Sequence, residues 1–141
     1  MKTILEAVSL HRSYASSGGS IDVLKGVDLV LSAGERVAVV GTSGAGKSTL
    51  LNLMGGLDQP TSGSVLVAGK DLNSLDEQAQ ALWRNQHLGF VFQFHHLMPE
   101  FSALEAVAMP ARIGGQSKQQ ARESARELLA SLGLEARLSH R

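Results

Sequence analysis

Gly41-Thr42-Ser43-Gly44-Ala45-Gly46-Lys47-Ser48-Thr49 is the stretch of this sequence that decides the fold. Residues 41–48 match the pattern G-x-x-x-x-G-K-[ST], a glycine-rich loop that joins a strand to the start of a helix. The apolar run Val37-Ala38-Val39-Val40 before it is typical of a strand buried on both faces. The leucine-rich residues after Lys47 predict one helix, which Gly55-Gly56 ends.

The chemistry of this loop suits a phosphate group. Its glycines let main-chain N–H groups turn inward around an anion, and the helix start adds the positive end of its dipole. We expect Lys47 to reach the β- and γ-phosphates, Ser48 to bind Mg²⁺ through its hydroxyl, and Thr49 to support the α-phosphate. The loop therefore predicts a purine nucleotide site for Mg-ATP, with these binding residues: Gly41, Thr42, Ser43, Gly44, Ala45, Gly46, Lys47, Ser48 and Thr49.

A glycine-rich turn without function is the alternative interpretation of the same residues. The fixed positions of the pattern coincide by chance in a chain of this length about once in a few hundred sequences. The strand-like and helix-like flanks make a coincidence rarer still, so we favour the phosphate site.

Composition limits the other classes of function. The 141 residues suit one domain, and 13 Lys and Arg balance 13 Asp and Glu, so no net field favours nucleic acid or an anionic membrane as a partner. The absence of cysteine excludes disulfide scaffolds and thiolate metal sites and is compatible with the cytoplasm. Glu6 interrupts any signal-peptide core, and no apolar run approaches the roughly 18 residues that cross a bilayer. Any membrane role therefore requires a partner.

The remaining elements are expected on both sides of the loop. Residues 4–10 and 23–31 alternate between apolar and polar side chains, which predicts an antiparallel strand pair, and residues 65–67 and 88–92 are also strand-like. Gly69-Lys70-Asp71 has turn chemistry. Ser74 with Glu77 predicts a capping box for a helix that runs to Arg84.

Beyond Gln93 the sequence becomes helical. Ser102 with Glu105 predicts a capped helix ending near Pro110, and residues 118–132 predict an amphipathic helix. The side chains expected on the buried side of the second helix are Ala121, Ala125, Leu128 and Leu132. Trp83 on the preceding helix is interpreted as packing and is given no functional role.

The chain resembles the nucleotide-binding subunits of ABC transporters over essentially its whole length. The matching motifs are Tyr14, Val23-Leu24-Lys25-Gly26-Val27, the glycine loop, Pro60-Thr61-Ser62-Gly63 and Gly89-Phe90-Val91-Phe92-Gln93. Within that family, the residues from Phe92 to Glu105 and Val107-Ala108-Met109-Pro110 are similar to the lipoprotein-releasing ATPases of Gram-negative bacteria.

This resemblance implies an α/β fold with a P-loop core, an N-terminal antiparallel β subdomain and the start of a helical subdomain. The implied division is residues 1–93 for the nucleotide-binding core and 94–141 for the helical part. Tyr14 takes the position whose ring stacks on adenine, and Gln93 the position whose amide approaches Mg²⁺ near the γ-phosphate. The implied partners are integral membrane permease subunits and, at full length, a second copy of the ATPase, on the cytoplasmic side of the inner membrane.

The family pattern also includes an L-S-G-G signature, an apolar strand ending in Asp-Glu and a switch histidine, and none of them occurs in these residues. The Asp76-Glu77 pair follows Leu72-Asn73-Ser74-Leu75, which predicts a capped helix start and not a strand. We therefore expect a truncated part of a longer ATPase that binds Mg-ATP, has no catalytic residue of its own, and exposes an unpaired apolar strand edge.

The hypothesis with most support is the ATP-binding subunit that energises lipoprotein release from the inner membrane. An ATPase of macrolide-export or cell-division type is an alternative inside the family. A non-catalytic nucleotide-binding module is the alternative from another class.

Overall fold

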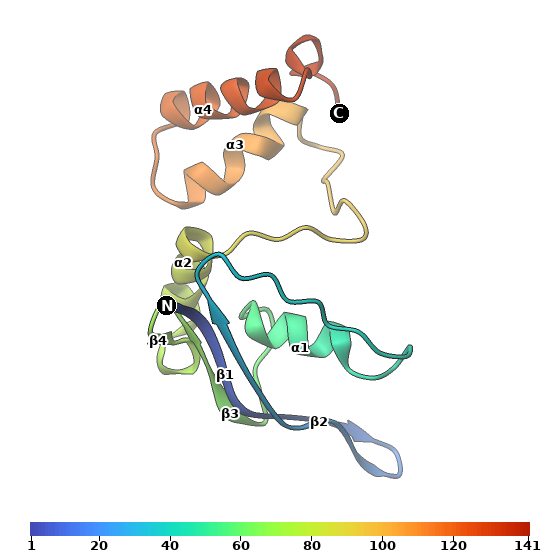
Figure 1. The fold of residues 1–141 in the computed structure, drawn as a ribbon. Coiled ribbons are helices and arrows are strands. Elements are labelled where there is room, and N and C mark those ends of the chain that lie inside the picture. The colour runs from blue at the N-terminus through green and yellow to red at the C-terminus, as the bar shows by residue number, and fades with distance from the viewer. The chain divides into compact units, whose positions relative to one another are not determined.

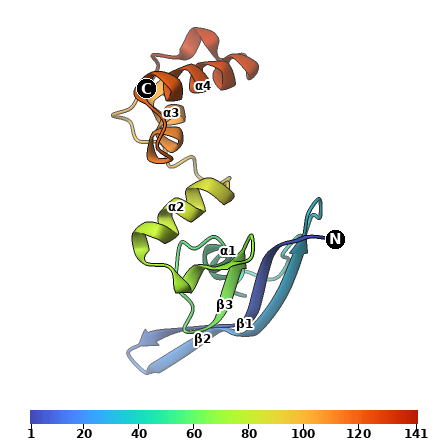
Figure 2. The same ribbon diagram turned by 90° about the vertical axis from the view of Figure 1, so that its left-hand side faces the viewer.

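The computed structural model describes residues 1–141, which form two compact units, Met1–Leu88 and Gly89–Arg141 (Figure 1, Figure 2). The first unit contains one antiparallel sheet with the strand order β2-β1-β3-β4. Its long hairpin is made of β1 (Thr3–Ser16) and β2 (Gly19–Ser32), and β3 (Ser62–Val67) pairs with the other edge of β1. The expected antiparallel strand pair is therefore confirmed.

A bulge in β1 explains one of the glycines in the first unit. The register of β1 against β2 shifts between Ala7 and Leu10, and Ser9 between them has a φ of 45°. Asp28 Oδ1 accepts the Ser9 N–H at 2.7 Å and supports this backbone. Gly63 passes so close to the Ser9 carbonyl oxygen that a Cβ would collide with it. The glycine is thus required by the approach of β3 to the bulge.

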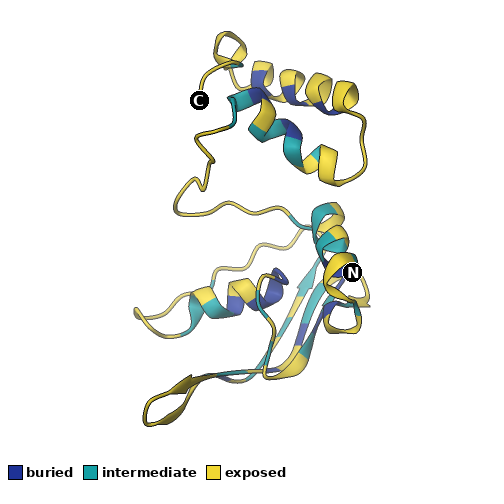
Figure 3. Ribbon diagram, turned by 180° about the vertical axis from the view of Figure 1, so that it is seen from behind, coloured by how far each residue is buried: buried dark blue, intermediate teal, exposed yellow.

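The core of the first unit lies between the sheet and α1 (Lys47–Met54), which covers one face of the strands (Figure 2). Figure 3 shows buried residues, in dark blue, in both the sheet and α1. These core residues are Ala7, Leu10, Leu24, Leu50, Leu53, Met54, Val65, Val67 and Leu72. The predicted helix and its stop are confirmed, since the Gly55 N–H caps the end on Leu51 O at 2.9 Å.

The apolar runs 37–40 and 88–92 do not form strands, which corrects two sequence predictions. Val37 and Val40 are 47% and 86% exposed, and Val91 is fully exposed. Val39 alone of the first run packs against the core. An apolar run becomes a strand only when a neighbouring backbone completes its hydrogen bonds, and the structure shows no such pairing for either segment.

The helix after β3 begins two residues later than the sequence suggested. Of the predicted turn residues, Gly69 lies in the turn that joins β3 to β4, whereas Lys70–Asp71 forms β4 itself. Leu72–Ser74 is the 3₁₀ turn η1, and Ser74 Oγ donates to Asp71 O. The N-cap of α2 (Glu77–His87) is Asp76, whose carboxylate accepts the Ala79 N–H at 2.8 Å. The predicted Ser74 capping box is wrong because Ser74 is already bonded within η1.

α2 is joined to β3 through Trp83. The Trp83 indole N–H donates to Val67 O at 3.1 Å, and the ring stacks on His87. Trp83 is partly buried against the core, which agrees with a packing residue.

The second unit is a helical hairpin of α3 (Ala103–Ile113) and α4 (Lys118–Ser131), followed by the 3₁₀ turn η2 (Glu135–Arg137). The capping box of Ser102 and Glu105 is confirmed, but α3 continues through Pro110. Proline removes one donor and still accepts, and Pro110 O takes the Gly114 N–H at 2.9 Å. The helix therefore ends at the glycine, not at the proline.

The buried face of α4 differs in part from the expected one. Ala121 and Ala125 are buried as predicted, whereas Leu128 and Leu132 are 59% and 73% exposed. Leu129 is buried in their place, because the i, i+4 spacing from Ala125 leads to it. The start of α3 is closed by the carboxyl-terminal segment, since Leu138 O accepts the Leu104 N–H at 3.1 Å.

Candidate nucleotide site

The glycine loop is an exposed turn whose backbone requires glycine at two positions. Gly44 and Gly46 have φ angles of 79° and 92°, in the left-handed region. The Ala45 N–H donates to Thr42 O at 3.2 Å and closes the turn. Local sequence thus sets the shape of the loop.

Gly46 also anchors the loop against the sheet. A Cβ on this residue would lie 3.0 Å from Val23 Cγ1 and 3.1 Å from Leu24 Cδ2, both in β2. Gly46 is the N-cap of α1 and has no side chain to accept a hydrogen bond from the first turn. The start of α1 is thereby held at β2 with its first N–H groups unused by a capping side chain.

Lys47 folds back over the loop. Its Nζ donates to Gly41 O at 2.7 Å and to Thr42 O at 2.6 Å. A Cβ on Gly41 would come within 3.3 Å of Ala45 Cβ and 3.9 Å of the same ammonium. The loop therefore surrounds a cation, and the space beside it exists only because residue 41 has no side chain.

This arrangement has the donors that a phosphate requires. The Lys47 ammonium lies within the loop, and the start of α1 follows it with the positive end of the helix dipole and no capping side chain. Ser48, in the first turn of α1, is exposed and carries the hydroxyl expected to bind Mg²⁺. The predicted residues from Gly41 to Thr49 are therefore contiguous in space as well as in sequence, and the residues present fit Mg-ATP.

Tyr14 lies near the end of β1 in a cluster with Arg12 and Asp58. The Arg12 guanidinium carbon is 4.4 Å from the centre of the Tyr14 ring, and the Tyr14 hydroxyl donates to Asp58 Oδ2 at 3.2 Å. Arg12 also forms a salt bridge with Asp58 at 3.1 Å. The Tyr14 side chain has the largest effect on the pKa of Arg12 and raises it; Asp58 raises it further, whereas burial lowers it.

Arg12 and Asp58 belong to no sequence motif. They are 46 residues apart, so no local motif joins them. The available signal was that Arg12 stands two residues before Tyr14, and alternate residues of a strand share a face.

Gln93 belongs to the second unit, on an exposed segment between α2 and α3. Its approach to the metal of a nucleotide stays a prediction. None of the helices in either unit is long and apolar enough to span a membrane.

Comparison with known proteins identifies a family and several relatives of this chain. The family model described as ABC transporter matches residues 24–141. A lipoprotein-releasing system ATP-binding protein LolD from Idiomarina loihiensis is 54% identical over 138 residues, covering 98% of this chain and 60% of the relative. The LolD of Pseudomonas syringae pv. tomato is also 54% identical, over 99% of this chain and 62% of its own length.

A solved structure supports the fold directly. The dimeric post-hydrolysis structure of the ATP-binding cassette MJ0796 bound to ADP and Pi has a TM-score of 0.86 and 35% identity. The match includes 98% of this chain and 61% of the solved chain. The chain thus spans about three fifths of the proteins that it matches, and its glycine loop lies within the matched region.

Proposed function

The chain belongs to the ABC transporter family, and from that premise we propose that it binds Mg-ATP through the loop from Gly41 to Thr49. The observation that carries the proposal is the pair of bonds from Lys47 Nζ to Gly41 O and Thr42 O. A phosphate that enters the loop accepts hydrogen bonds from this ammonium in place of the two carbonyls, and only the Lys47 side chain has to move. Before the phosphate binds, the two loop carbonyls keep the Lys47 ammonium at the site.

The other contacts of the nucleotide are proposed from the resemblance to nucleotide-binding subunits of ABC transporters. Tyr14 stacks on adenine, Ser48 binds Mg²⁺ through its hydroxyl, and Gln93 contributes its amide oxygen to the metal. Residues 1–93 act as the nucleotide-binding core and 94–141 as the helical part. A magnesium ion held by Ser48 and Gln93 would neutralise phosphate charge at this site.

Residues 1–141 are proposed to bind nucleotide without turning it over. The Asp76-Glu77 pair begins α2, where the Asp76 carboxylate is occupied with the Ala79 N–H. It therefore differs from a strand-end pair that holds a metal and activates water. Binding without hydrolysis is what the described residues support, and it makes a nucleotide-binding module the second candidate.

The wider function proposed is that of the ATPase subunit that energises lipoprotein release. Its support is the identity of more than half of the aligned residues with LolD proteins. The proposed partners are integral membrane permease subunits and a second ATPase copy, at the cytoplasmic face of the inner membrane. Co-purification of the native gene product with a drug-export or cell-division permease would reject this cargo assignment.

Titration calorimetry of the 141-residue protein with Mg-ATP tests the site. We expect saturable, magnesium-dependent binding that Lys47→Ala reduces by at least tenfold, because one charge-assisted contact is worth roughly 1.5–3 kcal/mol. Lys70→Ala is the matched control, since it removes an exposed lysine in β4.

Two results would count against the proposal. Equal weakening by both lysine variants would show a general charge effect instead of a loop site. Steady-state phosphate release by this protein that Lys47→Ala abolishes would overturn the claim of binding without turnover.

A further inference from the structure

We propose that Arg12, held by Asp58, is a positioning residue that fixes the Tyr14 ring for stacking on the adenine base. The inference rests on the nucleotide site proposed above and deepens it. It concerns a contact made in the protein before the base arrives.

The three side chains form a closed ring of contacts. Arg12 lies over one face of Tyr14, with 4.4 Å between the guanidinium carbon and the ring centre. The Arg12 Nη2 atom is 3.1 Å from Asp58, and the Tyr14 hydroxyl donates to the same carboxylate at 3.2 Å. The phenol is therefore fixed by its face and by its outer edge, which restricts both of its side-chain torsions.

Arg12 keeps this pose at the expense of a hydrogen bond. Its Nε is buried and has no hydrogen-bond partner. A buried N–H without a partner destabilises a fold, so its presence needs a compensating interaction. The compensation is the contact with the Tyr14 ring together with the salt bridge to Asp58.

The backbone that carries Asp58 is tied to β1. The Thr61 N–H donates to His11 O at 2.8 Å, and the Ser13 N–H donates to Thr61 Oγ1 at 2.9 Å. The Gln59 N–H donates to Asp58 Oδ1 at 2.8 Å. Asp58 is thus held next to β1, the strand that carries Arg12 and Tyr14.

A fixed Tyr14 ring favours binding because little side-chain entropy is lost when the base stacks on it. Tyr14 is 38% exposed, so part of the ring remains open to a ligand while Arg12 covers one face. Stacking on a mobile ring would require that ring to be immobilised during binding, which opposes association. Arg12 and Asp58 remove this penalty in advance.

The experiment compares ATP with inorganic tripolyphosphate by titration calorimetry on the 141-residue protein. Tripolyphosphate has no base, so it reports the loop alone. We expect Arg12→Ala to weaken ATP binding roughly three- to tenfold and to leave tripolyphosphate binding unchanged. Arg12→Lys keeps the charge but loses the planar guanidinium, so its affinity for ATP should lie between those of the native protein and Arg12→Ala.

A double-variant cycle identifies Tyr14 as the intermediary. In a Tyr14→Ala background, Arg12→Ala should have no further effect on ATP, because there is no ring to position. Additive losses, equal losses for both ligands, or unchanged ATP binding would overturn the inference. Failure of the native protein to bind either ligand would instead reject the proposed nucleotide site, and unchanged tripolyphosphate binding shows that a variant is folded.

Discussion

Gly46 and Gly44 have similar left-handed backbones but different surroundings, which makes them a matched pair at the residue scale. Their φ angles are 92° and 79°. A Cβ at Gly46 would crowd Val23 and Leu24, whereas a Cβ at Gly44 would meet nothing within 4 Å. Gly46 is required by its left-handed backbone and by the close β2 side chains, whereas Gly44 is required by its backbone alone.

We therefore expect Gly44→Ala to lower the free energy of unfolding by about 1–2 kcal/mol, the penalty of an L-residue in this region. Gly46→Ala should cost about 2–4 kcal/mol, since displacement of β2 side chains adds to the same penalty. Urea unfolding followed by circular dichroism measures both. Equal losses for the two variants would show that the contact with β2 contributes nothing.

Residues that act through local chemistry could be foreseen from the sequence, and those that meet across the fold could not. The glycine loop sets its own turn, so its place before α1 followed from the spacing of its residues. Arg12 and Asp58 meet only because β1 and the turn before β3 lie side by side. No local pattern predicts that pairing, because the two residues are 46 positions apart in the sequence.

At the scale of elements, the capping box of α3 is the clearest electrostatic feature. Glu105 accepts the Ser102 N–H at 2.8 Å, and Ser102 Oγ accepts the Glu105 N–H. The backbone bond first, and the Ser102 side chain second, lower the pKa of Glu105 from its ordinary value of 4.5. The folded state therefore prefers the charged carboxylate.

The sign of the pH effect follows from this lowered pKa. Glu105 stabilises the fold above its unfolded pKa of 4.5, and the contribution is lost as the pH falls through the lower folded pKa. Glu105→Gln should thus destabilise the protein near neutral pH, and its difference from the native protein should shrink in acid. Thermal unfolding across that range measures the difference.

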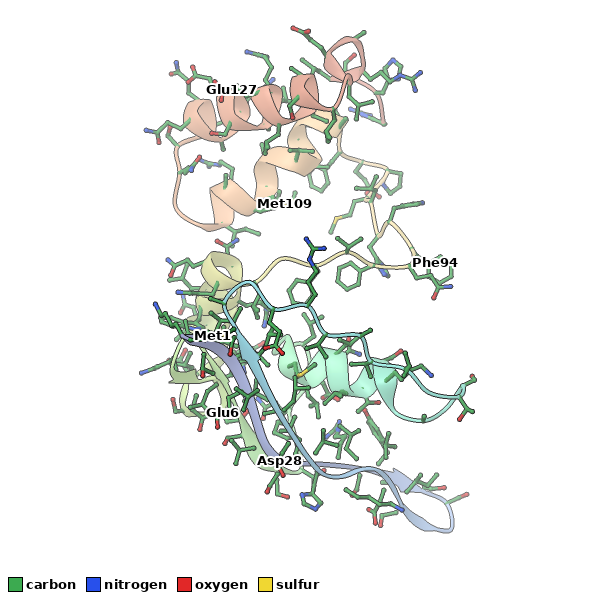
Figure 4. The ribbon with its side chains drawn as sticks, viewed as in Figure 1. Met1, Glu6, Asp28, Phe94, Met109 and Glu127 are labelled. Carbon is green, nitrogen blue, oxygen red and sulfur yellow. The ribbon has the colours of Figure 1, made fainter.

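Glu127→Gln is the control, because Glu127 is an exposed carboxylate on α4, where Figure 4 labels it. Its effect should be small and should not follow the same pH dependence. A difference for Glu105→Gln that stays constant with pH would mean that the carboxylate charge plays no part in the cap.

Elements differ in how far sequence determines them. The cap of α3 was predictable because both partners lie within one turn. Residues 37–40 and 88–92 have the same apolar composition as a buried strand, yet strand formation depends on a distant backbone that no local pattern contains. The start of α2 was misplaced because Ser74 and Asp76 are both good caps. Local bonds decided between them, since Ser74 Oγ donates to Asp71 O and the Asp76 carboxylate accepts the Ala79 N–H.

At the scale of the whole molecule, the exposed apolar side chains dominate the expected solution behaviour. Two stretches concentrate them, residues 37–40 and 90–98. The members that are at least half exposed are Val40, Val91, Phe94, Leu97 and Met98. Figure 4 shows Phe94 at the outer bend of its segment. With a formal net charge of +0, little electrostatic repulsion opposes association of such surfaces.

We expect concentration-dependent self-association, which Val91→Lys should reduce. Val91 is 103% exposed, so the substitution removes an apolar contact without leaving a cavity. Leu128→Lys is the matched control, because it adds the same charge at an exposed leucine on α4 outside both stretches. Sedimentation velocity over a range of concentrations should show a larger shift towards monomer for Val91→Lys. Equal shifts would assign the association to net charge, and the exposed apolar segment would then have no part in it.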